Sequence, residues 1–171
     1  MPGCVVVING PGSAGKSTLV RAVQPLLPRP FLAFGLDLFL FGDVLPRDRS
    51  GRVRDWSGLR PVVLDGHRRA VRALADAGAD VLVDVVVEDR EQSDALDDAL
   101  AGLDVFWVGL HAPAEEIERR ERARGDRTLG EGVRDLATVH AVHGYDVELD
   151  STLGVDACAR QLVEAWVGRQ T

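Results

Sequence analysis

Eight consecutive residues near the N-terminus combine the residue types and spacing of a phosphate-binding loop. Residues 10–17 fit the pattern G-x-x-x-x-G-K-[ST] and directly follow a strand-like apolar run at residues 4–8. Glycines let backbone N–H groups turn toward an anion, and a helix that starts here adds its positive N-terminal end. Lys16 would then reach the β- and γ-phosphates of ATP, and the Ser17 hydroxyl would coordinate Mg²⁺. The residues predicted to bind the nucleotide are Gly10, Pro11, Gly12, Ser13, Ala14, Gly15, Lys16, Ser17 and Thr18.

The only lysine of the chain lies inside this loop, whereas the rest of its 20 basic residues are arginines. A compact ammonium group can follow a phosphoryl group during transfer, while a planar guanidinium group is bulkier and holds a fixed geometry. The alternative is a glycine-rich turn that matches the pattern by chance. The strand pattern before the loop, the helical pattern after it and the isolated lysine favour phosphate binding, with a catalytic role for Lys16.

Two carboxylates follow or interrupt the strand-like runs that should flank the loop. Asp37 comes just after the run at residues 31–35, and the carboxyl ends of parallel strands share the edge at which a phosphate-binding loop opens. Asp84 interrupts the β-branched run at residues 80–87, where an acidic residue is costly without a partner. We predict that Asp84 completes the Mg²⁺ site beside Ser17, in the manner of a Walker B aspartate. The alternatives are a helix N-cap for Asp37 and, for Asp84, a turn cap or an ion pair with an arginine.

A dense group of arginines lies at residues 119–127. Its first three members are Arg119, Arg120 and Arg122. On a helix, these three would form solvated ion pairs that contribute little each. Arg124 and Arg127 differ because a Gly-Asp turn separates them, which suits a lid that closes over a nucleotide. We predict that residues 119–132 form this lid, and that Arg124 and Arg127 stabilise the charge that develops on the transferring phosphoryl group.

Five strand-like apolar runs alternate with segments of helical periodicity along the whole chain. The strand runs lie at residues 4–8, 31–35, 80–87, 104–110 and 146–150. The helical segments lie at residues 17–27, 62–77, 91–100, 133–142 and 155–167, with a further charged helix after Pro113. This order predicts one α/β domain over residues 1–171, a three-layer P-loop NTPase fold with a five-stranded parallel sheet of the nucleoside-monophosphate-kinase type. Residues 39–61 lack periodicity, so we interpret them as a loop region on the acceptor side, with a solvated surface segment as the alternative.

Composition argues against several classes of protein. A net charge of -7 disfavours nucleic acid as a partner. No apolar run approaches the ~20 residues of a membrane span, and no basic segment precedes the apolar N-terminal stretch, so we expect a cytoplasmic protein that does not bind membranes. Cys4 and Cys158 are expected to be core thiols, and His140 and His143 to be structural residues. A homo-oligomer is compatible with these features.

Several short motifs add a more specific signal. They are residues 9–17, Phe34-Gly35-Leu36-Asp37, Val83-Asp84, Phe106-Trp107-Val108-Gly109, Ala123-Arg124-Gly125-Asp126-Arg127, Val139-His140 and residues 145–150. Taken together, and over nearly the whole chain, they resemble the chloramphenicol phosphotransferase family. The resemblance implies transfer of the γ-phosphate of ATP to a hydroxyl of an antibiotic, with Asp37 as the general base. A carboxylate at this position is chemically suited to orient an alcohol and to accept its proton.

Two regions that should border the acceptor differ from the family pattern. After Asp84 the family has a second aspartate and a small glycine-containing loop, whereas residues 85–89 here are Val-Val-Val-Glu-Asp. Residues 39–56 show no close match. The expected acceptor is therefore a hydroxylated small-molecule antibiotic, chloramphenicol-like or another translation inhibitor, whose phosphorylation would give resistance or self-protection. The alternatives are a metabolic kinase for a nucleoside, nucleotide or sugar, and a nucleotide-binding regulator that transfers no phosphate to a small molecule.

Overall fold

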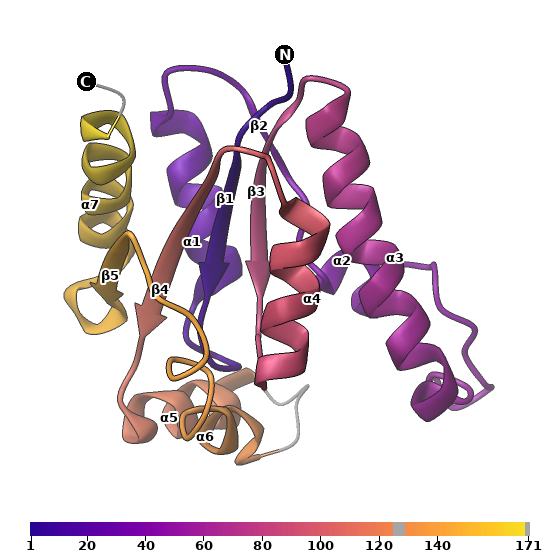
Figure 1. Cartoon of the computed structure of the whole chain (residues 1–171). Coiled ribbons are helices and arrows are strands. Elements are labelled where there is room, and N and C mark those ends of the chain that lie inside the picture. The colour runs from indigo at the N-terminus through magenta and orange to yellow at the C-terminus, as the bar shows by residue number, and fades with distance from the viewer. Residues whose placement is uncertain (125–128, 170–171) are drawn as a thin grey trace.

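A five-stranded parallel sheet forms the centre of the computed structural model, which describes residues 1–124 and 129–169 (Figure 1). Its strands are β1 (Val5–Asn9), β2 (Phe31–Ala33), β3 (Asp80–Val85), β4 (Val105–His111) and β5 (Val147–Asp150), in the order β2-β3-β1-β4-β5. The central strand β1 pairs in parallel with β3 on one side and β4 on the other. All five strands therefore end at the same edge of the sheet, which is the lower edge in Figure 1. This arrangement confirms the predicted P-loop NTPase fold.

Helices cover both faces of the sheet and complete three layers (Figure 1). On one face lie α1 (Lys16–Val23) and α7 (Val155–Gly168), and on the other lie α3 (Trp56–Asp76) and α4 (Arg90–Leu100). The remaining helices are α2 (Asp37–Phe41), α5 (Ala114–Arg124) and α6 (Glu131–Asp135), with 3₁₀ turns η1 (Gln24–Leu26) and η2 (Ser151–Leu153). Figure 1 places α5 and α6 beyond the carboxyl ends of the strands, beside the predicted phosphate-binding loop.

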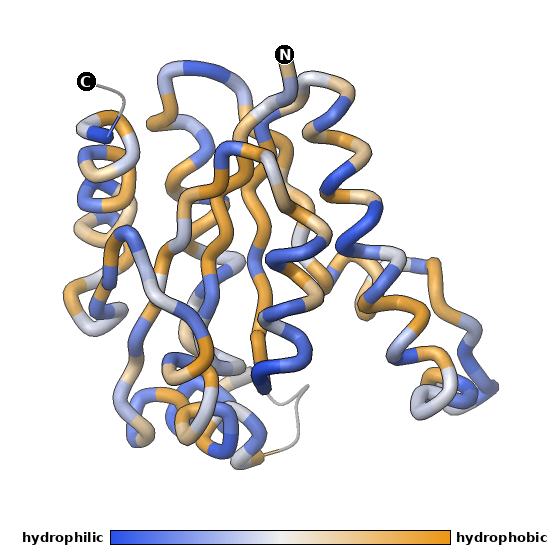
Figure 2. Tube along the Cα trace, in the orientation of Figure 1, coloured by the Kyte–Doolittle hydropathy of each residue, from blue (hydrophilic) through white to orange (hydrophobic). Residues whose placement is uncertain are grey.

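The core follows from the alternation of side chains along the buried strands. Val6 and Ile8 of β1 join the apolar cluster beneath α1 and α7, while Val5 and Val7 join the cluster beneath α3 and α4. β-Branched residues that are apolar on both faces suit a central parallel strand, and all five residues of β1 are buried. Figure 2 shows the result as strands that are mostly orange, with a few hydrophilic positions, between helices that alternate in colour.

The helix that was expected over residues 62–77 begins six residues earlier, so this prediction was wrong at its start. The Asp55 carboxylate accepts a hydrogen bond from Gly58 N and caps the first turn of α3 at Trp56. Pro61 lies inside the helix. The sequence therefore did not indicate the start at Trp56, because a proline usually indicates a helix boundary. The irregular stretch assigned to residues 39–61 is therefore shorter, since α2 occupies its beginning and α3 its end.

The helix expected over residues 133–142 was also wrong, because the structure has only α6 followed by a series of turns. The Val139 carbonyl accepts hydrogen bonds from Asn9 Nδ2 and Tyr145 Oη rather than from a following helical turn. Long-range side-chain donors thus compete with the helix at this position. Among the helices in the described ranges, none has both the length and the apolar composition needed to span a membrane.

Candidate active site

The loop between β1 and α1 has the backbone geometry of a phosphate cradle. Ser13 and Gly15 adopt left-handed φ angles of 61° and 104°, which turns successive peptide units of the loop inward. Lys16 is only 9% exposed, and its Nζ donates to the carbonyls of Gly10 at 2.7 Å and Pro11 at 2.8 Å. No side chain within the described residues caps the start of α1, so its first N–H groups face the loop. This geometry suits an anion bound through the loop backbone, which stays a prediction.

The two predicted Mg²⁺ ligands are in contact. Ser17 Oγ donates to Asp84 Oδ2 at 2.7 Å, from the first turn of α1 to the strand β3. A hydroxyl and a carboxylate are the hard oxygen ligands that Mg²⁺ prefers, and this ion usually takes few protein ligands because it keeps waters and binds phosphates. The described residues contain no group of three or more His, Cys, Asp or Glu that would form an all-protein metal site. The donor set therefore fits a Mg²⁺ ion that is shared with a nucleotide.

The turn after β2 packs directly against Asp84. A Cβ built on Gly35 would lie 1.7 Å from Asp84 Oδ1, so only glycine fits at this position. Asp37 follows two residues later as the first residue of α2, where it is half-buried. Leu36, rather than Asp37, is the N-cap of this helix. The fold therefore brings the predicted base to the same edge of the sheet as the phosphate-binding loop.

Arg120 has a role that its sequence context did not reveal. As expected for a helical ion pair, its Nε lies 2.7 Å from Glu116 Oε1. Its Nη1 also donates to the carbonyl of Ala14 at 2.5 Å, inside the phosphate-binding loop. The interpretation of Arg120 as a merely solvated ion pair was therefore wrong. The helical spacing from Ile117, which is fully buried, could have identified this inward face of α5.

The other arginines of this cluster divide into two groups. Arg119 and Arg122 form the expected exposed ion pairs, with Glu116 and Glu118 respectively. The α5 helix ends at Arg124, whose side chain lies outside the described part of the chain, as do residues 125–128 with Arg127. The lid role of Arg124 and Arg127 stays a prediction.

A cavity of about 400 Å³ opens between the phosphate-binding loop, α5 and the start of α7. Leu19, Leu110 and Val155 give it apolar walls, and Arg119 and Arg120 add positive charge beside the loop. Its size and mixed lining suit a small ligand that has both apolar and polar parts. Its lining residues are Ser13, Ala14, Gly15, Thr18, Leu19, Leu110, Arg119, Arg120, Ala123, Ser151, Gly154, Val155 and Cys158.

The α6 helix also packs on the phosphate-binding loop through residues that the sequence did not single out. Asp135 Oδ2 accepts from Gly12 N at 3.0 Å, and Gly132 lies so close that a Cβ there would meet Gly12 O at 2.3 Å. Glu121 of α5 is 1% exposed and accepts from the N–H groups of Gly130 and Gly132 at the start of α6. The two helices that overlap the predicted lid, α5 and α6, are thus hydrogen-bonded to the loop through Arg120 and Asp135.

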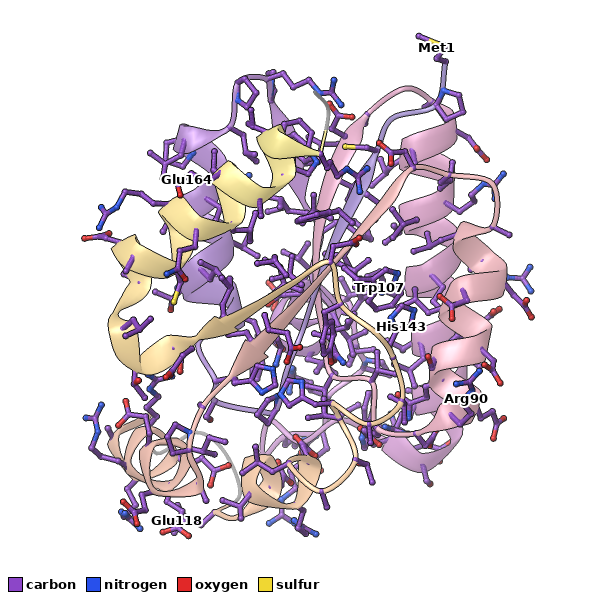
Figure 3. The ribbon with its side chains drawn as sticks, turned by 60° about the vertical axis from the view of Figure 1, so that its left-hand side comes forward. Met1, Arg90, Trp107, Glu118, His143 and Glu164 are labelled. Atoms are coloured by element: carbon purple, nitrogen blue, oxygen red, sulfur yellow. The ribbon has the colours of Figure 1, made fainter. Side chains whose placement is uncertain are left out.

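The two histidines near the end of the chain make contacts within the protein. His140 Nδ1 lies 2.9 Å from Tyr145 Oη, and its ring stacks on His111. Burial first, and then the neighbouring His111, lower the pKa of His140 to about 4, so its imidazole is neutral at pH 7. His143 stacks on Trp107 with ring centroids 3.6 Å apart (Figure 3). These contacts agree with structural roles for both residues.

Comparison with known proteins identifies the family of this chain. The family model described as chloramphenicol phosphotransferase-like protein matches residues 3–167. Two sequences from Mycobacterium tuberculosis strains, both described as "Putative O-phosphotransferase", are 35% identical to this chain, and the alignment covers 96% of this chain and 82% of each relative.

Solved structures of P-loop kinases share the fold. The Mycobacterium tuberculosis APS kinase CysC, solved with AMPPNP and APS, superposes with a TM-score of 0.72 at 20% identity, covering 96% of this chain and 98% of that chain. Shikimate kinase from Acinetobacter baumannii, solved with shikimate, gives a TM-score of 0.65 at 16% identity, covering 99% and 94%. With the family match, the chain belongs to the chloramphenicol phosphotransferase-like protein family and is an ATP-dependent phosphotransferase.

Proposed function

We propose that this phosphotransferase moves the γ-phosphate of ATP to a hydroxyl of a small-molecule antibiotic, either chloramphenicol-like or another hydroxylated translation inhibitor. Phosphorylation of such a drug in the cytoplasm would give resistance or self-protection. One observation supports the proposal most. The Ser17–Asp84 pair and the turn that leads to Asp37 meet at Gly35, so a nucleotide side and an acceptor side share one edge of the sheet.

In the proposed reaction, Asp37 accepts a proton and Lys16 neutralises charge. The acceptor oxygen forms a bond to the γ-phosphorus while the bond between that phosphorus and the oxygen bridging to the β-phosphate breaks. The hydroxyl proton passes to the carboxylate of Asp37 and then to solvent, and the products are ADP and a phosphate monoester. Lys16 neutralises charge on the β- and γ-phosphates, and it can follow the moving group because its ammonium is a mobile point charge.

A Mg²⁺ ion fits the Ser17 and Asp84 oxygens, and when bound it would neutralise charge between the β- and γ-phosphates. Two contacts support this role by fixing the Asp84 carboxylate: Gly35 leaves space for its Oδ1, and Ser17 donates a hydrogen bond to its Oδ2. Arg120 orients the loop by binding the Ala14 carbonyl. The lid arginines, Arg124 and Arg127, would add positive charge to the transferring group.

The ligands are assigned to opposite sides of the phosphate-binding loop. The nucleoside would occupy the cavity beside Arg119 and Arg120, next to the loop residues that hold its phosphates. The acceptor would lie over α2 and the segment after it, where Leu38, Phe41 and Val44 are more than half exposed. Apolar side chains exposed beside a carboxylate suit an acceptor that has both an apolar group and a hydroxyl.

A mass-spectrometric panel tests the proposal. The protein is incubated with Mg-ATP and single hydroxylated compounds, and each product is examined for the gain of one phosphoryl unit. The panel contains chloramphenicol, other hydroxylated translation inhibitors, nucleosides, nucleotides and sugars, with the Lys16→Ala variant as the inactive control.

The pattern of labelling distinguishes the alternatives. We expect transfer to at least one antibiotic, at a rate well above that for the metabolites. Labelling of only a nucleoside, nucleotide or sugar would replace the proposal with a metabolic kinase. ATP consumption that no added alcohol changes would favour a nucleotide-binding regulator.

A further inference from the structure

His67, in the middle of α3, binds the backbone carbonyl of Phe34 at the exit of β2. The distance from His67 Nε2 to Phe34 O is 2.9 Å, and His67 is 2% exposed. A carbonyl can only accept, so Nε2 must carry the proton of this hydrogen bond. Burial lowers the pKa of His67, which favours the neutral imidazole, and the hydrogen bond to Phe34 O selects its Nε2–H tautomer.

The Phe34–Gly35 turn is held at three points. Phe34 N donates to Leu82 O of β3 at 2.8 Å, and Phe34 O accepts from His67. Gly35 packs against the carboxylate of Asp84 with no space for a side chain. The first turn of α2 then forms directly on this support, because Leu38 N donates to Gly35 O at 3.2 Å. The position of Asp37 therefore depends on the turn that His67 holds.

The imidazole of His67 also packs against Phe34 and Phe39, which precede and follow Asp37 in the sequence. Its ring stacks on Phe34, with centroids 5.5 Å apart and an interplanar angle of 9°. It meets Phe39 of α2 edge-on, with centroids 6.0 Å apart. Aromatic contacts of this kind add to the hydrogen bond and link α3 to the start of α2.

We propose that His67 is a positioning residue that sets the distance between Asp37 and the Ser17–Asp84 pair by holding the Phe34–Gly35 turn. The expected effect on turnover rests on the proposed role of Asp37 as the base. The claim that His67 holds the Phe34–Gly35 turn does not depend on that role, so the two claims can be tested separately. His67 does not touch the reacting atoms, and its effect passes through Phe34 and Gly35.

Hydrogen exchange tests the positioning without an acceptor. Three variants of the whole chain are compared by mass spectrometry. His67→Leu removes the donor, His67→Gln keeps an N–H at a similar reach, and Val71→Ala opens a cavity one turn further along α3 as a control for lost stability.

The expected exchange results concern the peptide that covers residues 34–41. In His67→Leu this peptide should exchange about 10-fold faster than in the wild type, because its local support is lost while the rest of the sheet stays protected. His67→Gln should stay within about twofold, and Val71→Ala should raise exchange no more here than elsewhere. Equal exchange in His67→Leu and the wild type would overturn the proposal.

Kinetics with the acceptor found in the panel test the consequence. We expect His67→Leu to lower kcat by about 10- to 100-fold with little change in the KM for ATP, since a misplacement of about 1 Å can cost this much. His67→Gln should restore most of the rate. In an Asp37→Asn background, His67→Leu should cost little more, because the group that it positions is already gone.

The outcomes separate the two claims. A normal kcat in His67→Leu would overturn the positioning role even if Asp37→Asn is inactive. An active Asp37→Asn variant would remove the base from the proposed function, while the exchange result would still decide whether His67 holds the turn.

Discussion

The two sides of the candidate site are built in different ways. On the nucleotide side, β1 is wholly buried and the loop after it is held by Lys16, Arg120 and Asp135, each bound to loop backbone. On the acceptor side, β2 has only three residues, and Phe41 and Val44 are 57% and 62% exposed. The proposed nucleotide side is therefore held in one geometry by the protein's own hydrogen bonds. The acceptor side presents apolar surface that a ligand would cover.

Apart from loss of the base Asp37 itself, the largest effect should come from the nucleotide side, through Lys16→Ala. Loss of the ammonium removes charge stabilisation from the phosphates in both the bound and the transition state, so we expect kcat/KM for ATP to fall by about 10³-fold. Nucleotide titration measures the loss of ATP binding, and steady-state kinetics measure the loss of transition-state stabilisation. A variant with near-normal turnover would show that this side of the site is not where phosphates bind.

Gly35→Ala should disturb the contact between the turn after β2 and the Asp84 carboxylate, where the two sides meet. A Cβ would lie 1.7 Å from Asp84 Oδ1, so either the carboxylate or the turn must move. We expect a loss of about 1–3 kcal/mol in the free energy of unfolding, measured in urea, and a lower affinity for Mg²⁺ in nucleotide titrations. Gly66→Ala is the control, because no heavy atom lies within 4 Å of a Cβ built there. Unchanged Mg²⁺ affinity in Gly35→Ala would separate the turn from the metal site.

Phe41→Ser should affect the acceptor side alone. If Phe41 becomes buried by the acceptor, its loss should raise the KM for that acceptor by about 10-fold and leave the KM for ATP unchanged, since covering such a side chain contributes about 1.5–3 kcal/mol. Val167→Ser in α7 serves as the control for losing an exposed apolar residue. A change in the KM for ATP alone would contradict the assignment of the two sides.

A pH-dependent effect on stability should come from His140. The pKa of His140 is about 4 in the folded chain and near 6.5 when unfolded, so the unfolded state binds more protons between these values. The contribution of His140 is fully present above about pH 6.5 and is lost as the pH falls toward 4. His140→Asn should therefore flatten the rise of the urea midpoint over this range. An unchanged slope would show that other groups cause it.

The parts of the site that could be predicted from sequence are those with local signals. The spacing of residues 10–17 and the β-branched runs predicted the loop, the sheet and the Ser17–Asp84 contact. Such patterns are local consequences of strand and loop geometry, so they are visible without the fold.

The parts that could not be predicted depend on distant partners. Arg120 binds a loop carbonyl 106 positions away, and Asp135 binds an amide 123 positions away. No spacing rule connects such pairs, because the fold alone brings them together. His67 is a similar case, since its partner is a backbone carbonyl in the turn after β2 and every residue has a carbonyl.

The central claim is that Asp37 accepts the proton of an alcohol that is lined up against ATP in the loop. The most direct test measures phosphoryl transfer and ATP binding in the same Asp37→Asn preparation. Removal of a general base should lower kcat by about 10²- to 10⁴-fold, and the Kd for Mg-ATP should stay within about twofold of the wild type. Near-normal transfer by Asp37→Asn, or a loss of transfer that simply follows a loss of ATP binding, would contradict the account.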